Sequence, residues 1–101
     1  MIRPIFHILT PERLRVFSHA DSYEAESLHS EGFIHCSFEH QLDGVIARYY
    51  SGENELSIIE IDPSKLESPL VEEPSTNGEI YPHVYGPINK GAVVAIINRK
   101  K

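Results

Sequence analysis

The stretch Glu31-Gly-Phe-Ile-His-Cys-Ser37 decides the order of the secondary structure, because helical signals end on one side of it and begin again on the other. Gly32 is well placed to stop a short helix over residues 22–31. The apolar residues after this glycine predict a strand that reaches Ser37. Serine is a residue type that caps helices, and residues 38–51 carry apolar side chains at helical spacing. We therefore predict a helix, a strand and a second helix in succession.

The flanking sequence separates helices from strands. Residues 5–9 predict a strand, and Thr10 followed by Pro11 predicts a helix that runs to about Ser18. In the second half of the chain we predict strands at residues 55–62, 69–73, 80–85 and 92–97. This separation indicates an α+β domain and not alternating βαβ units. Because Ala92–Ile97 is apolar throughout, we expect it to be a central strand.

The composition is typical of one globular domain. The 101 residues are enough for a single domain, 1–101, with its own core. The formal net charge of -6 argues against a long nucleic acid as partner, because phosphate binding needs a basic face. No segment approaches the ~18 apolar residues of a membrane span, and the N-terminus has no signal peptide pattern. We therefore expect a cytoplasmic protein with no membrane partner, and its single cysteine excludes an intramolecular disulfide.

Three of the six histidines lie in predicted strands or extended segments: His7, His35 and His83. In each segment, strand alternation turns the imidazole away from its apolar neighbours. An imidazole titrates near neutral pH and can donate a hydrogen bond, accept one or bind a metal ion. We therefore expect at least two of these three side chains to share one site. The remaining histidines lie among polar residues and are expected at the surface: His19, His29 and His40.

The neighbours of His35 allow several roles. Cys36 points to the opposite strand face, so a Cys/His catalytic pair is geometrically poor and we expect a buried, small apolar residue. Ser37 shares the face of His35 and is either a hydroxyl of the site or the cap of the next helix. The two roles are compatible, because a helix N-terminus behind the site would favour an anionic ligand. A metal site built by His7, His35 and His83 is a further alternative.

The segment Tyr81-Pro-His-Val-Tyr-Gly-Pro87 is the densest unusual stretch of the chain. Two prolines and a glycine restrict the backbone around one histidine and two tyrosines. One interpretation is a structural turn whose tyrosine rings pack on the core. The other is the rim of a site, where the rings give a flat surface on which a base or nicotinamide ring stacks.

Together these motifs resemble a small bacterial family catalogued as domain of unknown function 952. The resemblance rests on five motifs: Phe6-His-Ile8, Glu31–Ser37, Tyr49-Tyr50, Ile59-Glu-Ile-Asp62 and Pro82–Pro87. It implies a fold related to the ADP-ribosyltransferase superfamily, with helices mainly in the first half packed on a split mixed β-sheet.

The resemblance also implies positions for the site residues. His7 matches the first functional position of that superfamily. His35, with Ser37 after it, matches the second, where RNA 2'-phosphotransferases carry histidine. His83 or Tyr85 stands near the third position, which is often a glutamate. Glu73 and Glu79 precede that motif, so neither matches by position.

From the resemblance we expect NAD or an ADP-ribose-like nucleotide as the small-molecule partner, with no metal cofactor. His7 would hold the ribose hydroxyls, His35 and Ser37 would contact ribose or phosphate, and Tyr85 would stack on a ring. His83 would act as acid or base, so the expected catalytic residues are His7, His35 and His83. A non-catalytic nucleotide-binding or interaction module on the same fold is an alternative, and the oligomeric state is open.

Overall fold

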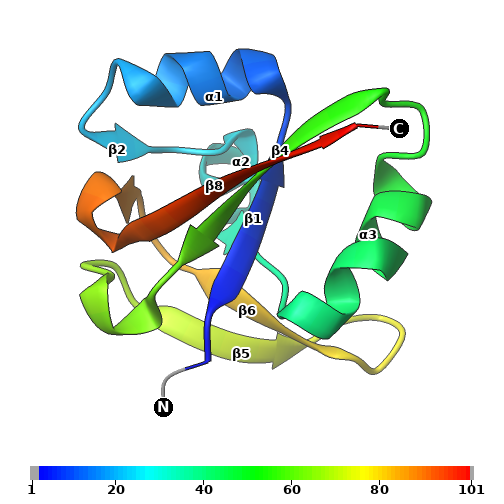
Figure 1. Cartoon of the computed structure of the whole chain (residues 1–101). Helices are drawn as coiled ribbons and strands as arrows, with labels where there is room; N and C mark the ends of the chain where they lie inside the picture. The colour runs from blue at the N-terminus through cyan, green and yellow to red at the C-terminus, as the bar shows by residue number, and fades with distance from the viewer. Residues whose placement is uncertain (1–2, 101) are drawn as a thin grey trace.

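The computed structural model describes residues 3–100 as short helices packed against antiparallel strands (Figure 1). The α-helices are α1 (Pro11–Ser18), α2 (Glu26–Glu31) and α3 (Leu42–Tyr49), and 3-10 turns form at η1 (Glu39–Gln41), η2 (Pro63–Lys65) and η3 (Lys90–Ala92). The strands are β1 (Ile5–Leu9), β2 (Ser22–Tyr23), β3 (Ile34–His35), β4 (Glu55–Ile61), β5 (Leu70–Pro74), β6 (Ile80–Val84), β7 (Ile88–Asn89) and β8 (Val93–Lys100). The α+β class and the helices in the first half are confirmed. None of the helices formed by residues 3–100 is long and apolar enough to cross a membrane.

The strands form three antiparallel sheets, with strand orders β1-β4-β8, β3-β6-β5 and β2-β7. A single bridge between Phe6 and Ser37 joins the two larger sheets. The Phe6 amide donates to the Ser37 carbonyl at 2.8 Å, and the Ser37 amide donates to the Phe6 carbonyl at 2.7 Å. Beyond this bridge β1 and β3 separate, because β1 belongs to the sheet β1-β4-β8 and β3 to the sheet β3-β6-β5.

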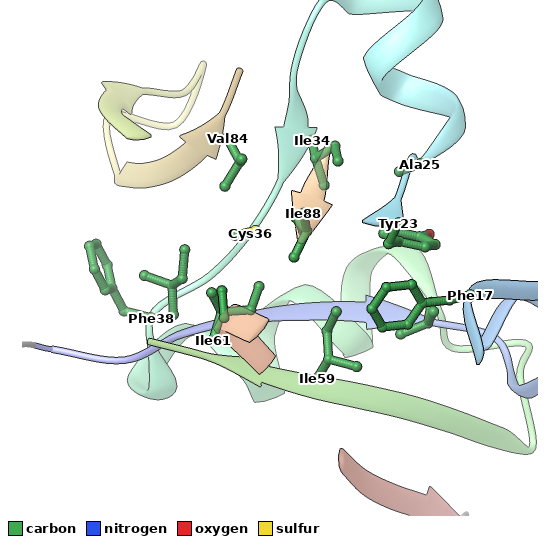
Figure 2. Packing of buried hydrophobic residues seen from close by; sticks show 13 residues of the cluster. Phe17, Tyr23, Ala25, Ile34, Cys36, Phe38, Ile59, Ile61, Val84 and Ile88 are labelled. Carbon is green, nitrogen blue, oxygen red and sulfur yellow. The ribbon is translucent and has the colours of Figure 1, made fainter. Parts of the chain in front are cut away.

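The main apolar cluster lies between the two larger sheets. Figure 2 shows Ile34 and Val84 facing Ile59 and Ile61 of β4 across this space. The four side chains are completely buried, and burying each one stabilises the fold by about 1.5–3 kcal/mol. A second cluster packs α3 against the other face of β1 and β4: Phe6, Ile8, Leu56 and Ile58 with Leu42, Val45, Ile46 and Tyr50. Strands β1 and β4 therefore form a layer that is covered on both faces.

Local signals at several element ends are confirmed. The Thr10 hydroxyl accepts a hydrogen bond from the Arg13 amide at 3.2 Å and caps α1, with Pro11 at its first position. Gly32 ends α2 with a φ of 91°, a conformation that glycine adopts without steric cost. The predicted strands of the second half also form, with their ends shifted by at most three residues.

The predicted cap and helix around Ser37 are wrong in detail. Ser37 uses its backbone to pair with Phe6, and the helix begins later, as η1 followed by α3. The Gln41 side chain accepts a hydrogen bond from the Phe38 amide at 2.9 Å and so caps the start of η1. The predicted helix over residues 22–31 is also shorter than expected, because Tyr23 pairs with Ile88 and only residues 26–31 are helical. Contacts between distant segments thus override the local signals.

The prediction that the last strand is central is wrong. Strand β8 lies at the edge of its sheet, next to the central strand β4. Its apolar side chains are correspondingly exposed: Val94 at 49%, Ile96 at 57% and Ile97 at 42%.

Candidate functional site

The predicted histidines gather where the two larger sheets separate, and two hollows open there. The smaller hollow has a volume of about 310 Å³ and is lined by His7 and His35. The larger has a volume of about 610 Å³ and is lined by His35 and His83. Four residues line both hollows and form the boundary between them: His35, Ser37, Val45 and Tyr50.

His7 is buried in β1, with 6% of its surface exposed, and both of its nitrogens are hydrogen-bonded. Its Nδ1 lies 2.7 Å from the backbone oxygen of His35. Because a carbonyl only accepts, the proton is assigned to Nδ1, and Nε2 then accepts from the Tyr23 hydroxyl at 3.1 Å. Burial lowers the pKa of His7 from 6.5 to about 4, although the bond to His35 opposes this shift. His7 is therefore neutral at physiological pH.

His35 extends from β3 toward solvent, and 55% of its side chain is exposed. Its Nε2 lies 3.1 Å from a carboxylate oxygen of Glu31, one helical turn earlier in the sequence. The centroid of its ring lies 5.3 Å from that of His83, in an edge-to-face arrangement. His35 thus contacts His7 through its backbone and His83 through its ring. The structure therefore brings the three predicted histidines together, with His35 in the middle.

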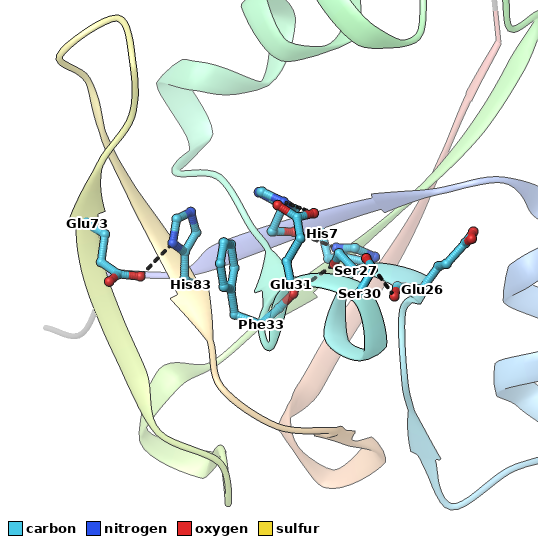
Figure 3. A network of polar contacts seen from close by, with 9 residues as sticks. His7, Glu26, Ser27, Ser30, Glu31, Phe33, Glu73 and His83 are labelled. Atoms are coloured by element: carbon cyan, nitrogen blue, oxygen red, sulfur yellow. Dashed lines mark hydrogen bonds and ion pairs between the residues drawn. The ribbon is translucent and has the colours of Figure 1, made fainter.

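His83 lies on β6 and is paired with a carboxylate (Figure 3). Its Nδ1 lies 2.8 Å from Glu73 Oε1, and the Tyr85 hydroxyl donates to the same oxygen at 2.6 Å. These two hydrogen bonds lower the pKa of the Glu73 carboxyl below its usual value of 4.5, and the bond from Tyr85 has the larger effect. Glu73 is therefore ionised at neutral pH, and its bond fixes the His83 proton on Nδ1 and leaves Nε2 as an acceptor.

The ring of Phe33 packs against both His35 and His83. Its ring stacks on His83 with centroids 4.1 Å apart, and it also contacts His35 at 4.9 Å and Tyr85 at 5.3 Å. This packing holds the His83 ring in one plane. Tyr85 lines neither of these two hollows, whereas Ser37 lines both of them together with His35.

The chain matches the family described as Protein of unknown function (DUF952) over residues 8–96.

The chain belongs to the DUF952 family.

Two solved structures have the same fold as this DUF952 chain. The crystal structure of protein CC0527 from Caulobacter crescentus has a TM-score of 0.85 and 24% identity, covering 94% of this chain and 84% of that one. The solution NMR structure of CC0527 has a TM-score of 0.80 and 24% identity, covering 93% and 82%. At this identity the likeness shows the fold alone. A comparison with curated proteins gives no match.

The metal alternative does not fit the DUF952 chain. Among residues 3–100, no group of three or more His, Cys, Asp or Glu side chains is placed to hold a metal ion. His7 would have to give up a hydrogen bond at one nitrogen to become a ligand. The expectation for Cys36 is confirmed, since the side chain is buried and burial raises the pKa of its thiol. The three other histidines are exposed, as predicted: His19, His29 and His40.

Sequence reasoning missed three side chains of the site in this DUF952 protein. Glu73 lies opposite Tyr81 in the β5–β6 hairpin, on the face that also carries His83. The Asn77-Gly78 turn between the strands was a usable signal, because a hairpin turn sets the register of its strands. The sequence predicts a helix at Tyr23, whereas this residue pairs with Ile88 and is buried against His7, a contact that has no local signal. Arg13 lines the smaller hollow and donates to the Glu24 carbonyl at 3.3 Å.

Proposed function

We propose that this DUF952 protein binds NAD or an ADP-ribose-like nucleotide in the two hollows and transfers its ADP-ribosyl group. The observation that carries the proposal is the carboxylate of Glu73 bonded to His83. The resemblance to the ADP-ribosyltransferase superfamily calls for an acidic group near the third position, and Glu73 supplies one from the neighbouring strand.

The size and polarity of the hollows support a nucleotide. Their volumes of about 310 and 610 Å³ fall in the range of roughly 300–1,000 Å³ that small-molecule sites occupy. The Arg13 guanidinium at the smaller hollow provides a positive charge for a phosphate. Tyr49 and Tyr50 line the larger hollow and offer aromatic rings to a base or nicotinamide.

The three histidines have different roles in this proposal. His35 and Ser37 line both hollows and are the groups that contact ribose or phosphate in this proposal. His7 has intramolecular partners at both nitrogens, so it acts as a positioning residue that holds the carbonyl of His35 and orients Tyr23. His83 is the acid or base, because Glu73 orients its ring and leaves Nε2 able to accept a proton.

The transfer step is balanced without a metal ion or redox partner. The bond between the ribose C1' and the nicotinamide nitrogen breaks, and nicotinamide leaves as a neutral molecule. The oxygen or nitrogen of an acceptor forms the new bond to C1', and its proton passes to His83 Nε2. The ionised Glu73 stabilises the imidazolium that results.

Calorimetric titration of the folded protein with NAD and with ADP-ribose tests binding. We expect millimolar or tighter affinity, and His35→Ala should weaken it at least tenfold, or about 1.4 kcal/mol. Absence of heat at about 1 mM ligand would contradict the proposal. Such a result would mean that the dissociation constant is above about 1 mM, which corresponds to a binding free energy weaker than about 4 kcal/mol.

A matched pair of variants tests the catalytic role. Glu73→Gln removes the carboxylate bonded to His83, whereas Glu72→Gln changes the exposed neighbour on the opposite strand face. We expect Glu73→Gln to lower release of nicotinamide from NAD by 10²-fold or more with little change in NAD affinity, and Glu72→Gln to leave both unchanged. Binding without nicotinamide release in the wild-type protein would instead indicate the non-catalytic nucleotide-binding module.

A further inference from the structure

Strand β8 combines the sequence of a central strand with the position of an edge strand. Its segment Val93-Val-Ala-Ile-Ile97 is apolar on both strand faces, a pattern typical of strands that have neighbours on both sides. In the structure β8 pairs with β4 on one side only, and the described residues 3–100 place no strand on the other side. Edge strands usually carry charges or proline along such a segment, and this one carries neither before Arg99.

The exposed side chains lie on both faces of β8. Ile96 is opposite Ile59 and Ile97 is opposite Ile58, and opposite residues of paired strands share a face. Ile59 belongs to the main cluster and Ile58 to the cluster beneath α3, so the two exposed isoleucines face different sides of the sheet. A helix docked on one face would cover one of them, whereas a further strand beside β8 would cover both.

We infer that β8 pairs antiparallel with β8 of a second copy of this chain. The two three-stranded sheets then form one sheet of strand order β1-β4-β8-β8-β4-β1. The contact uses backbone groups along the free edge and buries Ile96 and Ile97 of both copies. Such a contact is an isologous dimer interface, in which the same surface of each copy is used.

Charge complementarity selects a second copy as the occupant and indicates the register. With Ile97 on the two-fold axis, Arg99 of one copy lies opposite Ala95 of the other. Ala95 is itself paired with Glu60 of β4, so Arg99, Ala95 and Glu60 form one row on one face. The Cα atoms of Arg99 and Glu60 would lie roughly 10 Å apart, two strand spacings, and the small alanine leaves room for their side chains to meet.

The existing partner of Arg99 is compatible with this contact. One guanidinium nitrogen of Arg99 lies 2.8 Å from Asp43 of α3, which holds the side chain on the same face. A guanidinium has five N–H donors, so the bond to Asp43 leaves N–H groups for Glu60 of the second copy. Two such pairs form in the dimer, related by the two-fold axis.

Sedimentation velocity of the wild-type protein tests the dimer directly. The edge is short, so we expect the mass to rise from one chain to two between roughly 10 µM and 1 mM, and high salt to weaken this association. Ile96→Lys should remain monomeric over the same range. Val16→Lys is the matched control, since it adds the same charge at another exposed apolar residue, 59% exposed on α1, and should dimerise like the wild type.

A charge swap tests the register. Glu60→Lys and Arg99→Glu should each weaken dimerisation by about threefold to tenfold, and the double variant should restore it. Thermal melts followed by circular dichroism show whether each variant is folded, and Val94→Lys replaces Ile96→Lys if that variant unfolds. A monomeric wild-type protein at 1 mM, or a folded β8 lysine variant that dimerises normally, would overturn the inference, and a double variant without recovery would overturn the register.

Discussion

At the scale of single residues, the site depends on two hydrogen-bonded imidazoles in different environments. His7 is buried and neutral, with a carbonyl at one nitrogen and a tyrosine hydroxyl at the other. His83 donates from Nδ1 to the ionised carboxylate of Glu73, and its ring stacks on Phe33. The same residue type is therefore held by a backbone carbonyl in one place and by a carboxylate in the other.

Burial of His7 should make the fold less stable as the pH falls. Its pKa is about 4 in the folded protein and 6.5 in the unfolded chain, so between these values the unfolded chain binds a proton that the folded protein does not. We expect the free energy of unfolding to decrease as the pH falls through this window, by on the order of 3 kcal/mol in total. Urea unfolding at a series of pH values measures this change.

Two variants separate His7 from the other titrating groups. His7→Gln should remove most of the dependence between pH 6.5 and 5, whereas His19→Gln, at an exposed position, should keep it. Equal slopes for wild type and His7→Gln in this window would show that His7 is not neutral in the folded protein.

At the scale of elements, the β5–β6 hairpin determines the carboxylate of the site. The alternation in Tyr81–Tyr85 could be read from the sequence, and it places His83 and Tyr85 on one face. Which acidic residue lies beside them depends on the register across the hairpin, where Glu73 is opposite Tyr81. A shift of one residue would have placed Glu72 there instead, so composition alone could not identify Glu73.

The end of this hairpin needs glycine at residue 86. Gly86 has a φ of 154°, and a Cβ atom there would lie 2.8 Å from the Ser68 Cβ atom. We expect Gly86→Ala to lower the free energy of unfolding by about 1–3 kcal/mol, through backbone strain and this close contact. Gly52→Ala is the control, because a Cβ atom at Gly52 has no neighbour within 4 Å. Chemical denaturation of both variants measures the difference, and equal stabilities would contradict the expectation.

At the scale of the whole molecule, one core holds the two larger sheets together on either side of the site. The backbone bridge of Phe6 and Ser37 and the bond from His7 to the His35 carbonyl connect these sheets, and the main apolar cluster fills the space beside them. His7 directly follows Phe6 on β1, and His35 on β3 lies two residues before Ser37. Because both histidines lie next to this junction, the packing of the core sets the shape of the hollows that they line.

A cavity in this core should destabilise the whole fold. Ile59 is completely buried in β4, and Ile59→Ala should lower the free energy of unfolding by about 2–5 kcal/mol. Ile80→Ala, at a residue that is 43% exposed, should cost less than about 1 kcal/mol. Denaturation followed both by circular dichroism and by tyrosine fluorescence measures these values. Two separate transitions in the wild type would show that the sheets do not unfold as one unit.

The sequence by itself determined the α+β class, most element positions, the start of α1 at Thr10 and the end of α2 at Gly32, because these depend on neighbouring residues. The sequence also identified His7, His35 and His83 as candidate site residues, and it indicated the family of the chain. Only the tertiary structure decided that Ser37 pairs with β1, that Glu73 meets His83, and that β8 lies at an edge. These features depend on strand order and register, which are set by contacts between residues far apart in the chain. The Asn77-Gly78 turn signals the β5–β6 hairpin, but the choice of Glu73 over Glu72 depends on the register of its strands.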